Sequence, residues 1–351
     1  MLKKYFARAN TSAGCVNLMK NNLENIEKLY ILKGSSKTAK TMVIKNVSDT
    51  LAKQFSRIEA VISPFNIMQY DGVIIRDIKT AVVDEDCIEK DCTGHVLDCD
   101  AFLKLSDCEA KKEYLCELKE KADRGYMGLY AEYEKGKEIH DEWEKIYIDN
   151  INFDRLNSYC QGVVGQLIGD KKGNKGTQNF ERFFGASTVD GSVNYIDNLT
   201  ENLSARYFIK GRPGTGKSTF LKKLARAAQE AGFDTEVYYC SFDKNSLDMV
   251  VVPELSFCVF DSTAPHEMFP SASRDSILDF YTESGLFGVD ERHEKELELI
   301  SKKYKHRISA GLAQLRVANL CMAEREFYLK RTIDNSSLEK ACDEILKEII
   351  K

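Results

Sequence analysis

The stretch Gly211-Arg-Pro-Gly-Thr-Gly-Lys-Ser218 decides how this chain is interpreted. It fits the pattern G-x-x-x-x-G-K-[ST], which binds phosphate when a strand precedes it and a helix follows it. Both elements are expected, because residues 206–210 form a short apolar run and residues 218–231 carry apolar side chains at helical spacing. The sequence therefore predicts a phosphate-binding loop between a strand and a helix.

Each residue type in this loop has a chemical role. The glycines allow a tight turn whose N–H groups point at phosphate oxygens, and the following helix adds its positive N-terminal end. Lys217 is expected to reach the β- and γ-phosphates, and the Ser218 hydroxyl is expected to bind Mg²⁺. The predicted nucleotide-binding residues are Gly211, Arg212, Pro213, Gly214, Thr215, Gly216, Lys217, Ser218 and Thr219.

A second part of the predicted site is the apolar run Phe257-Cys-Val-Phe-Asp261, which ends in a carboxylate. In P-loop proteins such an aspartate holds the magnesium ion, so Asp261 and Ser218 are the predicted Mg²⁺ ligands. Ser262 follows Asp261, where motor-type ATPases have a glutamate, and the chain has no Asn-Lys-x-Asp guanine motif. The short separation of Lys217 and Asp261 favours the small kinase-like branch of these proteins.

Asp248 and His266 are further candidates for catalysis, beside Lys217 and Asp261. A carboxylate at Asp248 would orient an acceptor hydroxyl or accept its proton. His266 would sense the γ-phosphate or act as an acid or base. The sequence leaves structural alternatives open for both residues, namely a turn cap and an ordinary loop histidine.

A duplication runs through the chain at an offset of 177 residues. The repeated residues cluster around the glycine-rich stretch and its surroundings. They include Gly14 and Gly191, Val16 and Val193, Asn17 and Asn194, Asn21 and Asn198, Tyr30 and Tyr207, Gly34 and Gly211, Lys40 and Lys217, Asp71 and Asp248, and Asp84 and Asp261. We therefore expect two homologous halves.

The N-terminal copy of the loop is degenerate. It has the sequence Gly34-Ser-Ser-Lys-Thr-Ala-Lys-Thr41, in which Lys37 replaces Gly214 and Ala39 replaces Gly216. Side chains at these two positions would crowd a bound phosphate. We therefore expect a structural or regulatory role for this copy, with residual nucleotide binding as the alternative.

The alternation of strands and helices predicts an α/β fold made of two tandem P-loop domains. Each domain is expected to have a parallel sheet flanked by helices and a long α-helical hairpin extension. The predicted boundaries are 1–170 for the degenerate repeat, 171–178 for a glycine-rich linker and 179–351 for the intact repeat.

The composition narrows the classes of function. The 351 residues include 50 Lys and Arg against 55 Asp and Glu, a balance that gives no reason to expect a nucleic-acid or membrane partner. There is no apolar run long enough for a bilayer and no signal-peptide pattern, so we expect a cytoplasmic protein with free thiols. A loose cluster of Cys87, Cys92, His95 and Cys99 leaves metal binding open, but its spacing is not typical of zinc sites.

The chain resembles a family of duplicated bacterial P-loop proteins classed as ATPases or nucleotide kinases, and the resemblance covers nearly its whole length. The most specific segments are residues 209–219, 239–248, 252–254 and 261–266, with 140–143 and 147–153 in the helical part. The resemblance implies an intact loop in both copies. This chain departs from that pattern in its N-terminal loop and in the Asp84-Glu-Asp-Cys87 segment.

These observations predict an ATP·Mg²⁺-binding protein that uses its C-terminal site as an ATPase or as a small-molecule or nucleotide kinase. The alternative is a nucleotide-dependent switch or interaction protein with little turnover, and a weaker one is a pseudoenzyme that binds nucleotide for stability. The sequence leaves open the phosphate acceptor, which is a small molecule or a protein, and the oligomeric state.

Overall fold

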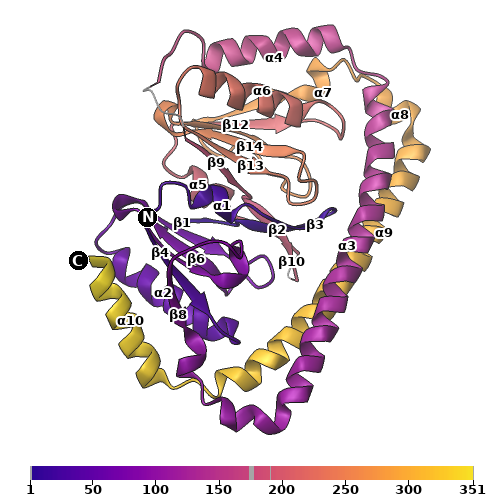
Figure 1. Cartoon of the computed structure of the whole chain (residues 1–351). Coiled ribbons are helices and arrows are strands. Elements are labelled where there is room, and N and C mark those ends of the chain that lie inside the picture. Colours follow the sequence, from indigo (N-terminus) through magenta and orange to yellow (C-terminus); the bar gives the residue numbers. More distant parts are fainter. Residues whose placement is uncertain (1, 174–177, 190, 351) are drawn as a thin grey trace.

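The computed structural model describes residues 2–173, 178–189 and 191–350 (Figure 1). The first half contains a sheet of β1 (Lys3–Tyr5), β4 (Lys28–Lys33), β5 (Ile58–Ile62), β6 (Tyr70–Ile75), β7 (Thr80–Asp84) and β8 (His95–Asp98). The second contains β9 (Asn179–Arg182), β12 (Ala205–Lys210), β13 (Thr235–Tyr239), β14 (Leu247–Val252), β15 (Phe257–Asp261) and β16 (Asp275–Asp279). The orders are β1-β5-β6-β7-β4-β8 and β9-β13-β14-β15-β12-β16, so corresponding strands occupy corresponding places.

The structure therefore agrees with a tandem duplication. The starts of β4 and β12, of β6 and β14, and of β7 and β15 are each 177 residues apart. The same offset relates two non-glycine residues with positive φ, Lys79 and Ser256, in the turns that precede β7 and β15. Residues 174–177 of the predicted linker lie outside the described residues.

The expectation of parallel sheets is wrong, because both sheets are mixed. Strand β14 runs antiparallel to both β13 and β15, whereas β12 is parallel to β15 and β16. The connections over residues 240–246 and 253–256 explain this arrangement. A parallel crossover needs about a dozen residues or more, so these short loops can only make hairpins.

The two sheets meet edge to edge on an approximate two-fold axis. Phe6 and Phe183, which are equivalent by the offset, exchange two backbone hydrogen bonds of 2.9 Å just beyond β1 and β9. Next to this bridge the fully buried Arg182 guanidinium lies 2.8 Å from Glu59 and 3.3 Å from Glu236, which are also equivalent. One arginine therefore bridges a pair of symmetry-related carboxylates at the centre of the molecule, and Arg76 and Lys3 each pair with one of them.

Two long helices, α3 (Lys112–Ile148) and α9 (Glu294–Lys330), run side by side along the molecule (Figure 1). They are antiparallel: a Cβ at Gly125 would lie 2.9 Å from Ala318, and one at Gly311 would lie 2.8 Å from Tyr133. The expected hairpin on each half is thus wrong. Each half contributes one helix of 37 residues, and its apolar stripe is covered by the matching helix of the other half.

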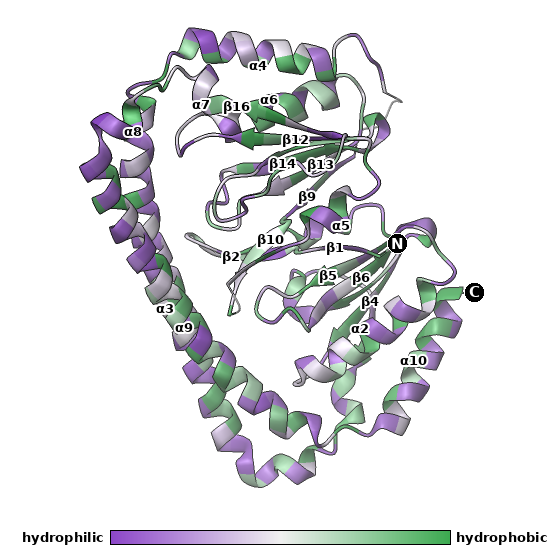
Figure 2. Ribbon diagram, turned by 180° about the vertical axis from the view of Figure 1, so that it is seen from behind, coloured by the Kyte–Doolittle hydropathy of each residue, from purple (hydrophilic) through white to green (hydrophobic). Residues whose placement is uncertain are grey.

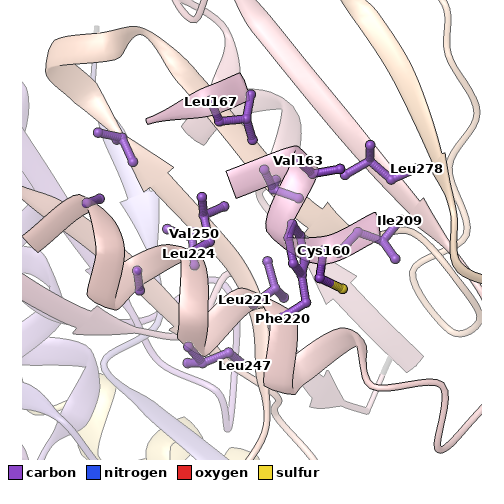
Figure 3. Close-up of a cluster of buried hydrophobic side chains, with 14 of the residues drawn as sticks. Cys160, Val163, Leu167, Ile209, Phe220, Leu221, Leu224, Leu247, Val250 and Leu278 are labelled. Carbon is purple, nitrogen blue, oxygen red and sulfur yellow. The ribbon is translucent and has the colours of Figure 1, made fainter. Parts of the chain in front are cut away.

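The halves also exchange their last helices. Helix α4 (Phe153–Leu167) follows α3 in the first half, yet it packs on α6 (Lys217–Glu230) and the second sheet (Figure 3). Its contact residues Leu156, Cys160, Val163 and Leu167 recur at helical spacing. Helix α10 (Asn335–Ile350) covers α2 (Lys37–Leu51) and the first sheet in the same way. The hydrophobic cores therefore cross the predicted boundary.

Smaller elements complete the fold. The hairpins β2–β3 (Arg8–Thr11 and Gly14–Asn17) and β10–β11 (Gly185–Thr188 and Gly191–Asn194) follow the edge strands β1 and β9. The short helices are α1 (Met19–Asn22), α5 (Ile196–Thr200), α7 (Phe280–Glu283) and α8 (Val289–Arg292). Apolar residues concentrate in the sheets, whereas the long helices mix apolar and polar residues (Figure 2). Among the described helices, none is both long and apolar enough to cross a membrane.

The exchange of helices predicts a specific effect of Ile345→Ala in α10. This side chain is 5% exposed within the core of the first half, so its loss should cost about 2–5 kcal/mol of unfolding free energy. Hydrogen exchange should accelerate in α2 more than in α6. The control Leu320→Ala removes a side chain that is 70% exposed and should change stability by less than about 0.5 kcal/mol. Equal effects of the two variants would contradict this packing.

Candidate functional site

The topology brings the predicted site residues of the second half to one sheet edge. Strands β12 and β15 are parallel neighbours with Ile209 opposite Asp261, so the loop of residues 211–218 begins beside that aspartate. Strand β14 runs the other way, and its second residue, Asp248, therefore lies at the same edge. We call residues 211–218 the C-terminal loop and residues 34–41 the N-terminal loop.

The C-terminal loop holds Lys217 against Asp261. Gly214 and Gly216 adopt φ values of 77° and 76°, which favour glycine, and α6 begins directly afterwards. The Lys217 Nζ atom lies 3.6 Å from Asp261 Oδ2 and donates a 2.8 Å hydrogen bond to the carbonyl of Arg212. The Ser218 hydroxyl accepts a 2.9 Å hydrogen bond from the N–H of Leu247, which fixes it beside β14.

Asp248 and Asp261 form a pair of interacting carboxylates. Burial raises the pKa of Asp248, and the negative charge of Asp261 raises it further, to about 8. Lys217 opposes this shift but does not overcome it. The positive charge around these two carboxyl groups is therefore too small to keep both of them ionised at neutral pH.

The equivalent carboxylates of the N-terminal half, Asp71 and Asp84, are fully neutralised. The Lys37 ammonium lies between them, 2.7 Å from Asp71 and 2.6 Å from Asp84. Arg8 binds Asp71 through two 2.8 Å hydrogen bonds, and Lys40 lies 2.6 Å from Asp84. Burial alone would raise the pKa of each carboxyl group, but these cations hold both pKa values below their usual range.

Two substitutions to glycine account for the difference between the halves. At the 177-residue offset, Gly214 stands where Lys37 stands in the first half, and Gly185 stands where Arg8 stands. Of the three cations Arg8, Lys37 and Lys40, only Lys40 has a cationic equivalent at the 177-residue offset, Lys217. The missing arginine could have been found from the sequence, since the pair Arg8 and Gly185 follows from the same offset.

The N-terminal loop already holds an anion from its own chain. The carboxylate of Glu326 in α9 accepts hydrogen bonds from the Ser36 hydroxyl at 2.8 Å and from the N–H groups of Lys37 and Thr38 at 3.0 Å. This side chain is 10% exposed. A buried carboxylate at the start of α2 satisfies N–H groups that a helix leaves free and also benefits from the helix dipole.

Helix α3 of the first half lies against the C-terminal loop. A Cβ at Gly214 would lie 2.6 Å from the carbonyl oxygen of Glu144 and 3.1 Å from Ile148. His140 lies one turn before Glu144, and Lys137 forms an ion pair with Asp243 at 3.6 Å. The sequence predicts no functional role for these residues, because no local pattern indicates that α3 crosses to the other half.

Other predicted residues lie at the margin of the site. The Arg212 side chain turns to Asp290 in α8, with 3.0 Å between Nε and Oδ2, and Thr219 is exposed. His266 is buried against Phe184 and lies 3.3 Å from the Ser192 hydroxyl. Burial lowers the pKa of His266 to about 4, which keeps it neutral at physiological pH.

Metal binding by the N-terminal cysteine cluster finds no support in the packing. Cys87 and Cys99 belong to different hydrophobic cores, and His95 stacks on Tyr30. Within the described ranges, one group of side chains has its ligand atoms within 4.8 Å of one another: His140, Asp141 and Glu144. The ammonium of Lys137 pairs with Asp141 there, so a cation is already present.

Comparisons of the chain with protein-family models, curated proteins and solved structures give no match.

The carboxylate pair predicts a pH-dependent stability in the absence of divalent cations. With a pKa near 8, folded Asp248 keeps a proton that the unfolded chain releases near pH 4, so stability falls as the pH rises between these values. Between pH 5 and 8 the wild type should lose about 2–4 kcal/mol more than Asp248→Asn in urea unfolding with a chelator. The exposed control Asp154→Asn should behave like the wild type. Parallel pH profiles for wild type and Asp248→Asn would contradict the pairing.

In the N-terminal half, Lys37→Met should destabilise the protein by about 2–3 kcal/mol at pH 7, because Asp71 and Asp84 each lose one hydrogen-bonded cation and keep one. Urea unfolding measures the loss. The exposed lysine Lys45 in the same helix provides a control, Lys45→Met, that should be nearly neutral. A neutral Lys37→Met would show that the ammonium contributes nothing to holding these carboxylates.

Proposed function

We propose that the protein binds ATP·Mg²⁺ at the C-terminal loop and hydrolyses ATP or transfers its γ-phosphoryl group to an acceptor. The observation that carries this proposal is the contrast between the halves. In the N-terminal half the Lys37 ammonium lies between the paired carboxylates, and the Glu326 carboxylate lies on the loop. Side chains of the protein itself therefore occupy both places. The C-terminal half has the same strands and loop, but Gly214 stands where Lys37 supplies the ammonium in the N-terminal half.

The cation would be Mg²⁺. Two carboxylates at one edge attract a divalent ion, whose preferred ligands are oxygens. Bound Mg²⁺ would lower the pKa of Asp248, because a nearby cation favours the ionised form. In this proposal Asp261 and the Ser218 hydroxyl hold the ion, and Asp248 lies near it.

The anion would be the phosphate chain of the nucleotide. In the N-terminal half the N–H groups of Lys37 and Thr38 bind the Glu326 carboxylate, and their equivalents at Gly214 and Thr215 would bind phosphate oxygens. Lys217 is close enough to Asp261 to neutralise charge on both the phosphates and the metal site. Catalysis would then rest on positioning and charge neutralisation.

ATP is favoured over GTP by the missing guanine motif. His266 is a weaker candidate for catalysis than Lys217, since its ring packs against Phe184 and the β10–β11 hairpin. Arg212, occupied by Asp290, would have to turn to reach a phosphate.

A nucleotide-dependent switch is the second candidate, and one contact favours it. Helix α3 lies on Gly214, so a phosphate entering the loop would press on a helix that extends along the whole molecule. In that case the protein would bind ATP and change conformation with little turnover.

Calorimetry with ATP and Mg²⁺, beside an assay of phosphate release, tests the proposal. We expect one nucleotide per chain and a loss of affinity of about 10–100-fold in Lys217→Ala, because a charge-assisted contact to phosphate is removed. Lys40→Ala is the matched control in the N-terminal half and should retain the single site. Phosphate release with wild type would favour the enzyme over the switch.

No binding of ATP·Mg²⁺ would overturn the proposal. Binding that survives in Lys217→Ala and is lost in Lys40→Ala would place the nucleotide in the N-terminal half, against the contrast described above.

A further inference from the structure

The C-terminal half has no carboxylate directly after Asp261 that could take a proton from an attacking nucleophile. Ser262 is buried and Thr263 donates its hydroxyl and its N–H to Asp261. In the N-terminal half the equivalent positions are Glu85 and Asp86. A general base for the C-terminal loop must therefore come from another part of the chain.

Helix α3 places one carboxylate against this loop. The backbone of Glu144 contacts Gly214, and its side chain lies beside His140, with 3.7 Å between the closest oxygen and nitrogen. The buried His140 Nδ1 atom has no hydrogen-bond partner among the described residues. Both residues come from the first half, and the His140 ring packs against Phe242 in the loop that follows β13 of the second half.

The other half shows how far a side chain at this helical position reaches. Helices α3 and α9 both span 37 residues, and Glu144 and Glu326 occupy the same place in them, 182 residues apart. The Glu326 carboxylate touches the N–H groups of the N-terminal loop. A glutamate at this position is therefore long enough to reach the C-terminal loop, and in this structure the Glu144 carboxylate lies beside His140.

The surroundings of Glu144 suit proton transfer. Burial raises its pKa, and the nearby charged groups are Lys137 and Asp141 on α3, Lys217 on α6 and Asp243 before β14. Burial lowers the pKa of His140, so its imidazole is neutral near pH 7 and can accept a proton. A base whose pKa is raised toward the working pH is more effective than an ordinary glutamate.

We propose that Glu144, delivered by α3 of the first half, is the general base of the C-terminal site. This inference rests on the proposed function. The Glu144 carboxylate takes the proton of a water molecule while the water oxygen forms a bond to the γ-phosphorus. The bond from that phosphorus to the bridging oxygen breaks, and ADP leaves with the electron pair. His140 lies beside the carboxylate, and its neutral imidazole can receive the proton from it.

The proposal explains why the degenerate half is an integral part of the protein. Its loop is filled by Glu326, but its long helix completes the active site of the other half. Neither half would then be active alone.

The test compares Glu144→Gln with Glu142→Gln, an exposed neighbour on the same helix, in the full-length protein. Glu144→Gln should bind ATP·Mg²⁺ with an affinity within about threefold of wild type in calorimetry, yet release phosphate at least about 100-fold more slowly. Glu142→Gln should match wild type in both assays. The wild-type rate should fall as the pH drops through the pKa of Glu144, and this limb should vanish in Glu144→Gln.

Four other results overturn the proposal, and they differ in what they say of ATP binding. Normal turnover by Glu144→Gln rejects the base and leaves the ATPase standing. Binding without turnover in the wild type also rejects it and favours the switch. If the wild type binds no nucleotide, the base and the proposed function fall together. A loss of affinity in Glu144→Gln equal to its loss of rate would assign Glu144 to binding rather than to proton transfer.

Discussion

The burial of two close carboxylates at one sheet edge is the constraint on which both halves depend. In each half one strand ends at this edge and its antiparallel neighbour begins there. The fold therefore brings the two carboxylates to the same edge. A pair of buried negative charges must be neutralised by a cation or by a proton. The N-terminal half uses Lys37 and Arg8, whereas the C-terminal half leaves Asp248 with a raised pKa. One half is therefore complete as folded, and the other is suited to an added cation.

The same pseudo-symmetry interlocks the halves. The backbone bridge of Phe6 and Phe183 lies on the axis, and Arg182 forms an ion pair with a carboxylate from each side of it. Helices α4 and α10 each cover the core of the other half, and α3 and α9 pair along their length. As a consequence, the loop of one half is bordered by a helix of the other. Changes in the first loop can thus leave the contact of α3 with the C-terminal loop intact.

The sequence predicted the local elements well and the long-range arrangement poorly. The expected strands at 206–210, 256–261 and 80–84 are confirmed to within a residue, since buried apolar runs and glycine turns are local signals. The mixed sheets and the exchanged helices depend on connections and contacts between distant segments, which periodicity does not report. In the site, the offset identified Lys37 as the residue replacing Gly214, but its contact with two carboxylates required the structure. The contact of Glu144 with the C-terminal loop was not predicted, because this loop belongs to the other half.

Diffraction from crystals grown with Mn²⁺ and a non-hydrolysable ATP analogue tests the central claim most directly, since the anomalous signal locates each metal ion. The account predicts one Mn²⁺ beside Asp261, with the analogue's phosphates on the C-terminal loop, and an unchanged ion pair of Lys37 with Asp84. A metal ion between Asp71 and Asp84, or no metal at Asp261 with the analogue bound, would contradict it.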